Sequence, residues 1–277
     1  MTFSDEFDGV RFDVADGIAT ITIDRPQAGN ALTSAQRARM VDWFARADED
    51  LAIRCVVLQA TGRFFCTGAD LSGGTVIPDA PERPADAPDE VIGERRRMML
   101  RGAIRNVSAI LDCEVPVIAK VQGTAAGIGA HLAFACDLVI ASENAKFIEV
   151  FARRALVADG LGTWLLPRLV GLQRAKELIL LAEDISAQRA HEIGLVARVV
   201  PAEDLDATVA AMARKLADGP TRAHAVNKWL LNRSLDVDRA TIAQEEAWMV
   251  DLMGRSLDSE EGVRSFIEKR EPKFRGY

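Results

Sequence analysis

The spacing of hydrophobic and polar residues along the chain predicts short strands separated by helices. Residues 18–23 (Ile-Ala-Thr-Ile-Thr-Ile) alternate apolar with small or polar side chains and precede an Asp-Arg-Pro sequence, a pattern typical of a strand followed by a turn. Further strands with many Val, Ile and Leu residues are predicted at 55–60, 115–121 and 138–141. The segments between these strands are too long for hairpins, which favours parallel strands joined by right-handed crossovers.

Helical periodicity fills the segments between these strands and nearly all of the chain after residue 201. A helix is predicted through about residue 50, with Thr33 as its N-cap and Gln36 completing a capping box. A second helix is predicted over residues 94–112, where apolar side chains recur at every third or fourth position.

The segment from residue 72 to residue 93 predicts a long loop. It holds four prolines among glycines, alanines and acids, and proline disfavours both a helix interior and a central strand. A loop of this length is either a lid or wall of a pocket, or a surface insertion without a role in function.

Two glycine-containing turns, at residues 64–71 (Phe-Phe-Cys-Thr-Gly-Ala-Asp-Leu) and 123–131 (Gly-Thr-Ala-Ala-Gly-Ile-Gly-Ala-His), each follow an apolar strand-like run. Two such turns can direct unpaired backbone N–H groups toward one point. Donors placed in this way stabilise negative charge that develops on a carbonyl oxygen, by roughly 3 to 4 kcal/mol each. The alternative is a simple chain reversal between strand and helix. The spacing excludes a dinucleotide-binding motif, a P-loop and a Ser nucleophile elbow.

Composition and charge limit the class of protein. The 277 residues are 49% hydrophobic and 27% charged, which is ordinary for a globular enzyme. The net charge of -7 argues against a general nucleic-acid surface. The four cysteines and three histidines form no recognisable metal or disulfide motif, so no metal site is expected.

Neither a membrane span nor a secretion signal is expected. No apolar run approaches the ~18 residues that a transmembrane helix needs. The first nine residues carry three acids instead of the cationic start of a signal peptide. The expected location is the cytoplasm.

Five segments, taken in order, resemble the crotonase (enoyl-CoA hydratase/isomerase) superfamily, and the resemblance extends over essentially the whole chain. They are residues 23–26 with 30–32, 65–71, 123–129, 165–171 and 266–274. The resemblance implies an α/β fold, with a spiral of ββα repeats over residues 1–201 and a C-terminal helical trimerisation region over 202–277. It also implies a homotrimer or dimer of trimers. The implied substrate is an acyl-CoA thioester, with no separate cofactor.

The same resemblance assigns the two oxyanion-binding N–H groups to Ala69 and Ile128. The second would begin a helix, where unsatisfied amides and the helix dipole favour negative charge. Gly127, beside Ile128, would allow a ligand to approach the backbone closely.

The resemblance also implies residues that bind the CoA portion of the substrate. The basic groups for its phosphates would be Arg25, Lys269 and Lys273, although each could instead be a solvated surface charge. The residues that border the adenine and pantetheine would be Thr67, Gly68, Asp70 and Leu71. Phe151 is expected to form an apolar wall of the pocket.

The acid–base residues decide which reaction is expected. Hydratases of this superfamily use two glutamates, and the matching positions here are His131 and Phe151, so high hydratase activity is not expected; Glu149 lies nearby in the sequence. His131 falls about one helical turn after Ile128. It is either an acid–base group or a packed helix residue.

Asp159 is the carboxylate expected to act as the catalytic base. Its segment resembles the ring-epoxide isomerase type of phenylacetate degradation; aspartates in this region shuttle protons in dienoyl-CoA isomerases and act as nucleophiles in chlorobenzoyl-CoA dehalogenases. Four apolar neighbours predict a raised pKa for the Asp159 carboxyl: Leu156, Val157, Leu161 and Trp164. The alternative role for Asp159 is a helix N-cap.

The favoured function is therefore an isomerase-type proton shuttle. The alternatives are a hydratase, a thioester hydrolase, a dehalogenase, or a catalytically inactive acyl-CoA-binding homologue.

Overall fold

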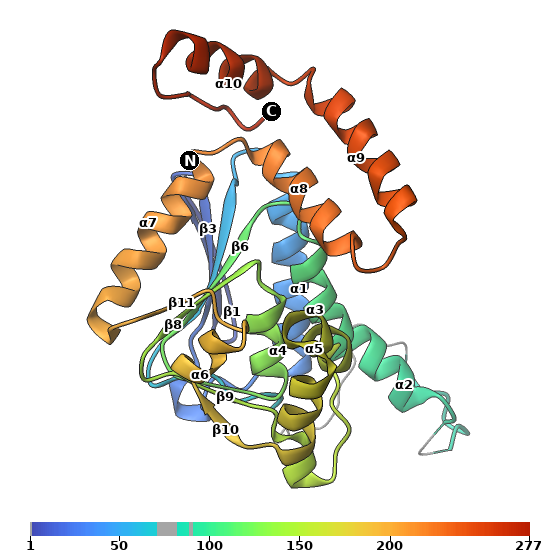
Figure 1. Ribbon diagram of the computed structural model, residues 1–277. Coiled ribbons are helices and arrows are strands. Elements are labelled where there is room, and N and C mark those ends of the chain that lie inside the picture. Colours follow the sequence, from blue (N-terminus) through green and yellow to red (C-terminus); the bar gives the residue numbers. More distant parts are fainter. Residues whose placement is uncertain (1, 71–81, 89–90) are drawn as a thin grey trace.

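The computed structural model describes residues 2–70, 82–88 and 91–277, in which two β-sheets lie against each other with helices around them (Figure 1). The larger sheet has the strand order β1-β2-β3-β4-β6-β8-β11. Its strands are β1 (Phe3–Phe7), β2 (Val10–Ala15), β3 (Ile18–Ile23), β4 (Cys55–Ala60), β6 (Val117–Val121), β8 (Leu138–Ser142) and β11 (Arg198–Val200).

Parallel pairing runs through this sheet from β3 to β11, as the crossover lengths predicted. Ile21 pairs with Leu58, and both are fully buried, as expected for parallel strands covered on two faces. The first three strands are joined as antiparallel hairpins. Strands β1 and β2 were not among the predicted strands.

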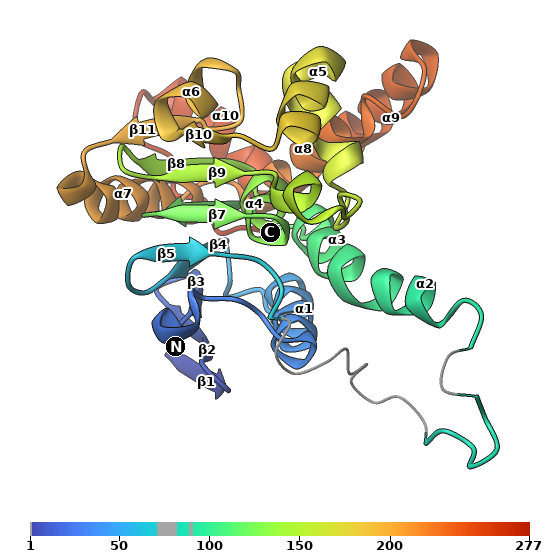
Figure 2. The same cartoon turned by 90° about the horizontal axis from the view of Figure 1, so that it is seen from below.

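A smaller sheet, with the order β10-β9-β7-β5, lies beside the larger one (Figure 2). Its strands are β5 (Phe64–Cys66), β7 (Thr124–Ala126), β9 (Lys146–Ile148) and β10 (Asp184–Ser186). Strands β5, β7 and β9 are parallel and follow β4, β6 and β8 of the larger sheet in turn. Their carboxyl ends therefore meet at one edge, where the chain enters α4 (Ile128–Ala135) and the turn after β5.

The predicted helices form with small differences in their bounds. Helix α1 (Ser34–Glu49) begins at the predicted capping box, in which Thr33 Oγ1 accepts from the Gln36 N–H and the Gln36 side chain accepts from the Thr33 N–H. The helix predicted over residues 94–112 is three consecutive segments: α2 (Glu94–Met99), a π-helical turn η2 (Leu100–Ile104) and α3 (Arg105–Asp112).

Short helical turns and two further helices complete the part of the chain before residue 202. They are η1 (Pro26–Ala28), η3 (Val150–Arg154), α5 (Gly162–Leu181) and α6 (Ala187–Glu192). Helix α4 is buried along its whole length, so its N-terminus is fixed by packing on every side.

The chain after β11 is helical, as predicted. It forms η4 (Ala202–Asp204), α7 (Leu205–Ala217), α8 (Thr221–Arg233), α9 (Arg239–Met253) and α10 (Leu257–Glu268). Helix α7 packs on the larger sheet, where Leu205 and Val209 join Val57 and Ile140 in one buried cluster. Contacts thus cross residue 201, and a boundary there stays a prediction.

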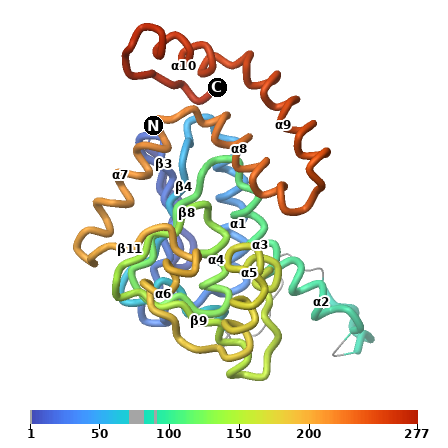
Figure 3. Tube along the Cα trace, in the orientation of Figure 1, coloured from blue at the N-terminus to red at the C-terminus, as the bar shows by residue number. Residues whose placement is uncertain are grey.

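Helices α9 and α10 extend away from the rest of the molecule (Figures 1 and 3). Helix α9 buries none of its residues, whereas the segment after α10 is tied back by Asp258, which accepts hydrogen bonds from the N–H groups of Arg275 and Gly276. Within the described residues, none of the helices is both long and apolar enough to cross a membrane.

Candidate active site

The two glycine-containing turns lie in direct contact. Strands β5 and β7 pair in parallel, with Cys66 opposite Ala125, so both chains leave the small sheet at the same edge. A Cβ on Gly129 would lie 2.2 Å from the Cys66 carbonyl oxygen, and one on Gly68 would lie 3.4 Å from the Ala126 carbonyl oxygen. Glycine at these positions therefore lets the turns approach each other.

The Ala69 N–H is free to bind a ligand in the first turn. Leu32 forms an isolated parallel bridge with Ala69, in which the Leu32 N–H donates to the Gly68 oxygen and the Leu32 oxygen accepts from the Asp70 N–H, both at 3.0 Å. This pattern uses the residues on either side of Ala69 and directs its own N–H away from Leu32. Among the described residues, no acceptor faces this N–H.

The Ile128 N–H is the corresponding donor in the second turn. Ile128 is the first residue of α4, and the first N–H groups of a helix have no acceptor within it. The Gly127 N–H, one residue before, donates to the Ile148 oxygen. The Ala130 N–H, two residues after, donates to the Gly127 oxygen. The structure thus brings both predicted donors to the same edge of the small sheet, the second with the positive end of a helix dipole.

His131, one turn into α4, is held by a carboxylate from the end of β9. Its Nε2 lies 2.9 Å from Glu149 Oε2, and both side chains are buried. The Phe151 ring stacks on the imidazole, with centroids 5.4 Å apart and planes at 16°. The predicted apolar wall at Phe151 therefore contacts His131, and Glu149 supplies an orienting partner that sequence reasoning did not find.

Asp159 lies in the segment that precedes α5, and its neighbour Gly160 packs against His131. A Cβ on Gly160 would lie 3.3 Å from Ile128 Cδ1 and 3.4 Å from His131 Nδ1. Burial raises the pKa of the Asp159 carboxyl, Glu149 adds to the rise, and His131 and Arg37 oppose it. Asp159 Oδ1 is buried and unpaired in the described part of the chain. This carboxylate is therefore poised to accept a proton.

Two expectations about Asp159 are wrong. Leu161, not Asp159, is the N-cap of α5, and the helix start receives no side-chain cap. Leu156 and Val157 do not form the apolar surroundings of Asp159, because they are 56% and 85% exposed. The residues that affect its pKa come instead from α1, α4 and the end of β9.

Arg37 is a buried cation that sequence reasoning missed. It lies on α1, donates to the Leu32 oxygen at 2.6 Å and to Ser34 Oγ at 3.1 Å, and interacts electrostatically with Asp159. Burial lowers its pKa, while the negative charge of Asp159 acts in the opposite direction. Arg37 therefore supports the strand segment beside Ala69 and also supplies positive charge near Asp159.

The expected CoA-binding residues fall into two groups. Near the first turn, Arg25 pairs with Asp70 at 3.0 Å, and Thr67 Oγ1 donates to the Gly29 oxygen at 2.9 Å. Leu71 lies outside the described residues, as does part of the loop over residues 72–93.

The second group lies in the C-terminal region. Lys269 is the C-cap of α10, and the Lys273 N–H donates to Glu261 at 2.8 Å. Helix α10 lies at the top of the molecule in Figure 1, well apart from α4. A single chain does not bring these lysines to the two turns.

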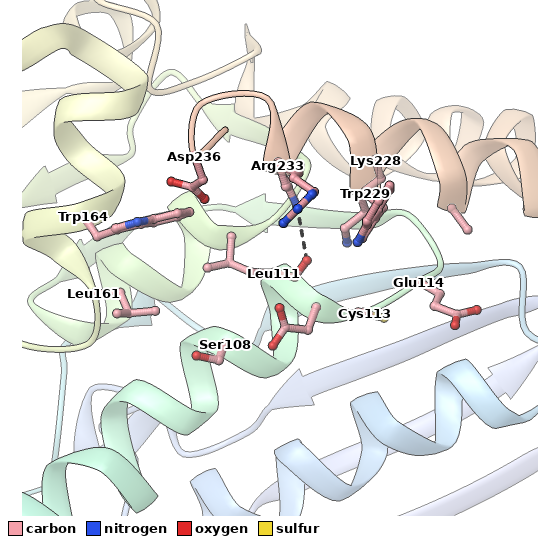
Figure 4. Close-up of a pocket in the computed structure, with 13 residues that line it drawn as sticks. Ser108, Leu111, Cys113, Glu114, Leu161, Trp164, Lys228, Trp229, Arg233 and Asp236 are labelled. Carbon is pink, nitrogen blue, oxygen red and sulfur yellow. Dashed lines mark hydrogen bonds between the residues drawn. The ribbon is translucent and has the colours of Figure 1, made fainter. Parts of the chain in front are cut away.

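A cavity of about 500 Å³ adjoins the site between α3, α5 and α8 (Figure 4). Trp164 and Trp229 stand on opposite sides of it, with Arg233 between them. Leu161 and Trp164 line the cavity and follow Asp159 closely in the chain, whereas Ala69, Ile128 and His131 are not part of its lining. The cavity is therefore a neighbour of the site and not the site itself.

Two strand-end turns in contact, a buried helix start and the carboxylate of Asp159 are thus gathered at this edge of the small sheet. The enoyl-CoA hydratase/isomerase family profile matches residues 13–277, and the chain belongs to this family. In the part of the chain that the structure describes, no group of three or more His, Cys, Asp or Glu side chains could hold a metal ion.

Two relatives of the chain bear different names. The chain is 38% identical to a probable enoyl-CoA hydratase of Rhodobacter capsulatus, over 96% of this chain and 98% of the relative. It is 37% identical to the 1,2-epoxyphenylacetyl-CoA isomerase of Escherichia coli, over 95% and 97%. Similarity therefore fixes the family and leaves the reaction open.

Solved structures agree with the fold. The chain is similar to a putative enoyl-CoA hydratase from Streptomyces coelicolor A3(2), with a TM-score of 0.89 and 34% identity over 98% of this chain and 96% of that one. An enoyl-CoA hydratase from Mycobacterium smegmatis gives a TM-score of 0.85 and 32% identity over 97% and 99%.

Proposed function

We propose that this protein isomerises an acyl-CoA thioester by moving a proton through Asp159. The observation that carries the proposal is the Asp159 carboxylate, which has a raised pKa, an unpaired buried oxygen and an electrostatic interaction with His131. The next residue, Gly160, lies against Ile128 and His131. A base of this kind suits removal of a proton from carbon, because its ionised form is less stabilised than in water.

The two backbone donors would hold the thioester oxygen while Asp159 acts. Asp159 takes a proton from the acyl chain, the C–H electron pair moves into an enolate, and the negative charge on the oxygen is stabilised by the Ala69 and Ile128 N–H groups. The proton then returns at another carbon, so that the double bond shifts without any redox change. The names of the relatives make aromatic and aliphatic acyl groups the substrates to test first.

The test is Asp159→Asn, compared with Asp204→Asn as an exposed control. Isomerisation and solvent deuterium exchange are measured over a panel of enoyl-CoA, dienoyl-CoA and aryl-epoxide acyl-CoA substrates. Asp159→Asn should lower kcat by about 100-fold to 10,000-fold while acyl-CoA still binds, because only the proton-transfer group is lost. A fully active Asp159→Asn variant contradicts the proposal.

Hydration is the second candidate, because Glu149 places another carboxylate in the site. The same panel separates the two reactions: a hydratase forms a hydroxyacyl-CoA, whereas an isomerase gives a product of unchanged mass. Hydrolase or dehalogenase activity would release free CoA or halide. Acyl-CoA binding without any turnover over the whole panel would identify a binding protein.

The lysines of the C-terminal region would bind CoA only in an oligomer. Since a single chain keeps Lys269 and Lys273 away from the two turns, we propose that another copy of the chain supplies them to the CoA phosphates. Arg25 is the candidate phosphate ligand within the same chain, where it already holds Asp70. We propose a cytoplasmic homotrimer or dimer of trimers as the working form.

A further inference from the structure

We propose that Glu149 is a positioning residue that fixes His131 as a second proton-transfer group beside Asp159. The inference rests on the proposed function for its chemistry, but its geometric part can be tested without any turnover. It concerns a pair of buried side chains, whose exposed fractions are 0% for His131 and 4% for Glu149.

Three contacts fix the plane of the His131 ring. Glu149 holds Nε2 at 2.9 Å, and Phe151 stacks on one face. Gly162 lies so near that a Cβ there would come within 2.2 Å of His131 Cε1 and 2.3 Å of Nε2. A ring confined in this way has little freedom to turn, so its two nitrogens have fixed and different surroundings.

The partner of Nε2 determines which nitrogen carries the proton. An ionised carboxylate can only accept hydrogen bonds, so Glu149 selects the form of His131 with its proton on Nε2. Nδ1 then carries no proton. It lies 3.4 Å from the position of a Cβ on Gly160, next to Asp159 in the chain, and has no partner among the described residues.

Three buried polar atoms in this site are unpaired in the described part of the chain: His131 Nδ1, Glu149 Oε1 and Asp159 Oδ1. Leaving a buried polar atom unpaired costs roughly 1 to 3 kcal/mol, so three of them close together are uncommon unless a ligand or water completes them. His131 Nδ1 and Asp159 Oδ1 are thus two atoms that a polar or proton-bearing part of the bound acyl group would complete.

The pair would act by taking up and returning one proton at Nδ1. A new N–H bond forms at Nδ1 as a C–H or O–H bond breaks, and the bonding electrons stay with the carbon or oxygen. The ring becomes positively charged, and the negative charge of Glu149 balances it across the Nε2 hydrogen bond. With Asp159, the site then has two groups that can remove a proton at one atom and deliver it at another.

The kinetic test uses Glu149→Leu, Glu149→Gln and the exposed control Glu203→Leu. Glu149→Leu should lower kcat by about 10-fold to 100-fold and change KM less than about twofold, since a positioned acid–base group is lost and the CoA contacts remain. Glu149→Gln keeps an oxygen that can accept from Nε2 and should recover part of kcat. Wild-type kcat in Glu149→Leu overturns the proposal.

The structural test needs neither substrate nor turnover. The chain has three histidines, so ring nitrogens can be followed by NMR after selective ¹⁵N-histidine labelling, with His131→Asn giving the assignment. His191 is an internal reference of the opposite form, because its Nδ1 lies 2.8 Å from the Val196 oxygen and must donate to it. His131 should carry its proton on Nε2 at pH 8, and a proton on Nδ1 overturns the assignment.

The outcomes separate this inference from the proposed function. Suppose that Asp159→Asn is active, that His131 Nδ1 carries no proton and that Glu149→Leu is impaired. Asp159 is then not the base, and the role of the His131–Glu149 pair stands. If Asp159→Asn is inactive and Glu149→Leu is unimpaired, Asp159 stands as the base and the role of Glu149 is overturned.

Discussion

Gly129 lies against the backbone of Cys66, and a Cβ at residue 129 would come within 2.2 Å of the Cys66 carbonyl oxygen. The contact joins the start of α4 to the end of β5, which are the elements that carry the Ile128 and Ala69 donors. Because the neighbouring atom is backbone, it cannot move aside as a flexible side chain would.

Gly129→Ala should therefore push the two donors apart. We expect a loss of at least about 100-fold in kcat, comparable to the loss of one oxyanion donor, and a destabilisation of about 1 to 3 kcal/mol from overpacking. Kinetics and urea unfolding measure both. Gly102→Ala is the matched control, since a Cβ at Gly102 meets nothing within 4 Å. Equal behaviour of the two variants would show that the contact does not matter.

Asp159→Asn should make the protein more stable at neutral pH. Burial raises the pKa of the folded-state carboxyl above its unfolded value, so wild-type stability falls as pH rises through the folded pKa and the carboxyl ionises. The neutral amide avoids this cost. The difference in free energy of unfolding between the variant and wild type should be near zero around pH 4 and grow toward pH 7. A constant difference over that range would argue against a raised pKa.

Arg37 should control the acidic limb of the pH–rate profile. Its positive charge lowers the pKa of the Asp159 carboxyl, so Arg37→Met should raise that pKa and move the acidic limb of kcat/KM to higher pH. Arg37→Lys keeps the charge and should leave the limb near its wild-type position. Profiles measured from pH 4.5 to 9 test this, and a limb that moves to lower pH in Arg37→Met would exclude the electrostatic role.

Helix α9 should be covered by another copy of the chain. It exposes Trp248, Val250 and Leu252 at 69%, 74% and 59%, more apolar surface than a helix of a monomer normally leaves open. Light scattering should give a trimer or a dimer of trimers for wild type and a lower mass for Trp248→Glu. Gln244→Glu adds the same charge at an exposed polar position of α9 and should keep the wild-type mass. A monomeric wild-type protein would refute the predicted assembly.

The sequence predicted the features that depend on local pattern. The Thr33–Gln36 capping box follows from residue types at short spacing, and the parallel strands follow from the length of the segments between them. The assignment of the two N–H donors to Ala69 and Ile128 came from the resemblance to the crotonase superfamily and stays a prediction. The surroundings of Asp159 did not follow, because Leu156 and Val157 are its neighbours in sequence while the chain turns them to solvent.

Glu149 could have been found from strand pairing. Ala126 ends β7 and Ile148 ends β9, and the two residues are parallel partners, so the residues that follow each strand lie close together. The signal is a long-range register between two three-residue strands, which periodicity cannot supply. Nothing in the sequence pattern indicated that Arg37 is buried, since an arginine on an amphipathic helix is normally exposed.

The glycine at residue 162 limits which side chains the site can accept. Its missing Cβ provides the space that the His131 ring occupies, so a larger residue at 162 is compatible only with a smaller or differently placed one at 131. The two positions are therefore expected to change together during evolution. A glutamate introduced at 131 to create hydratase chemistry must be selected jointly with residues 149 and 162, and single substitutions are a poor guide to what the site can become.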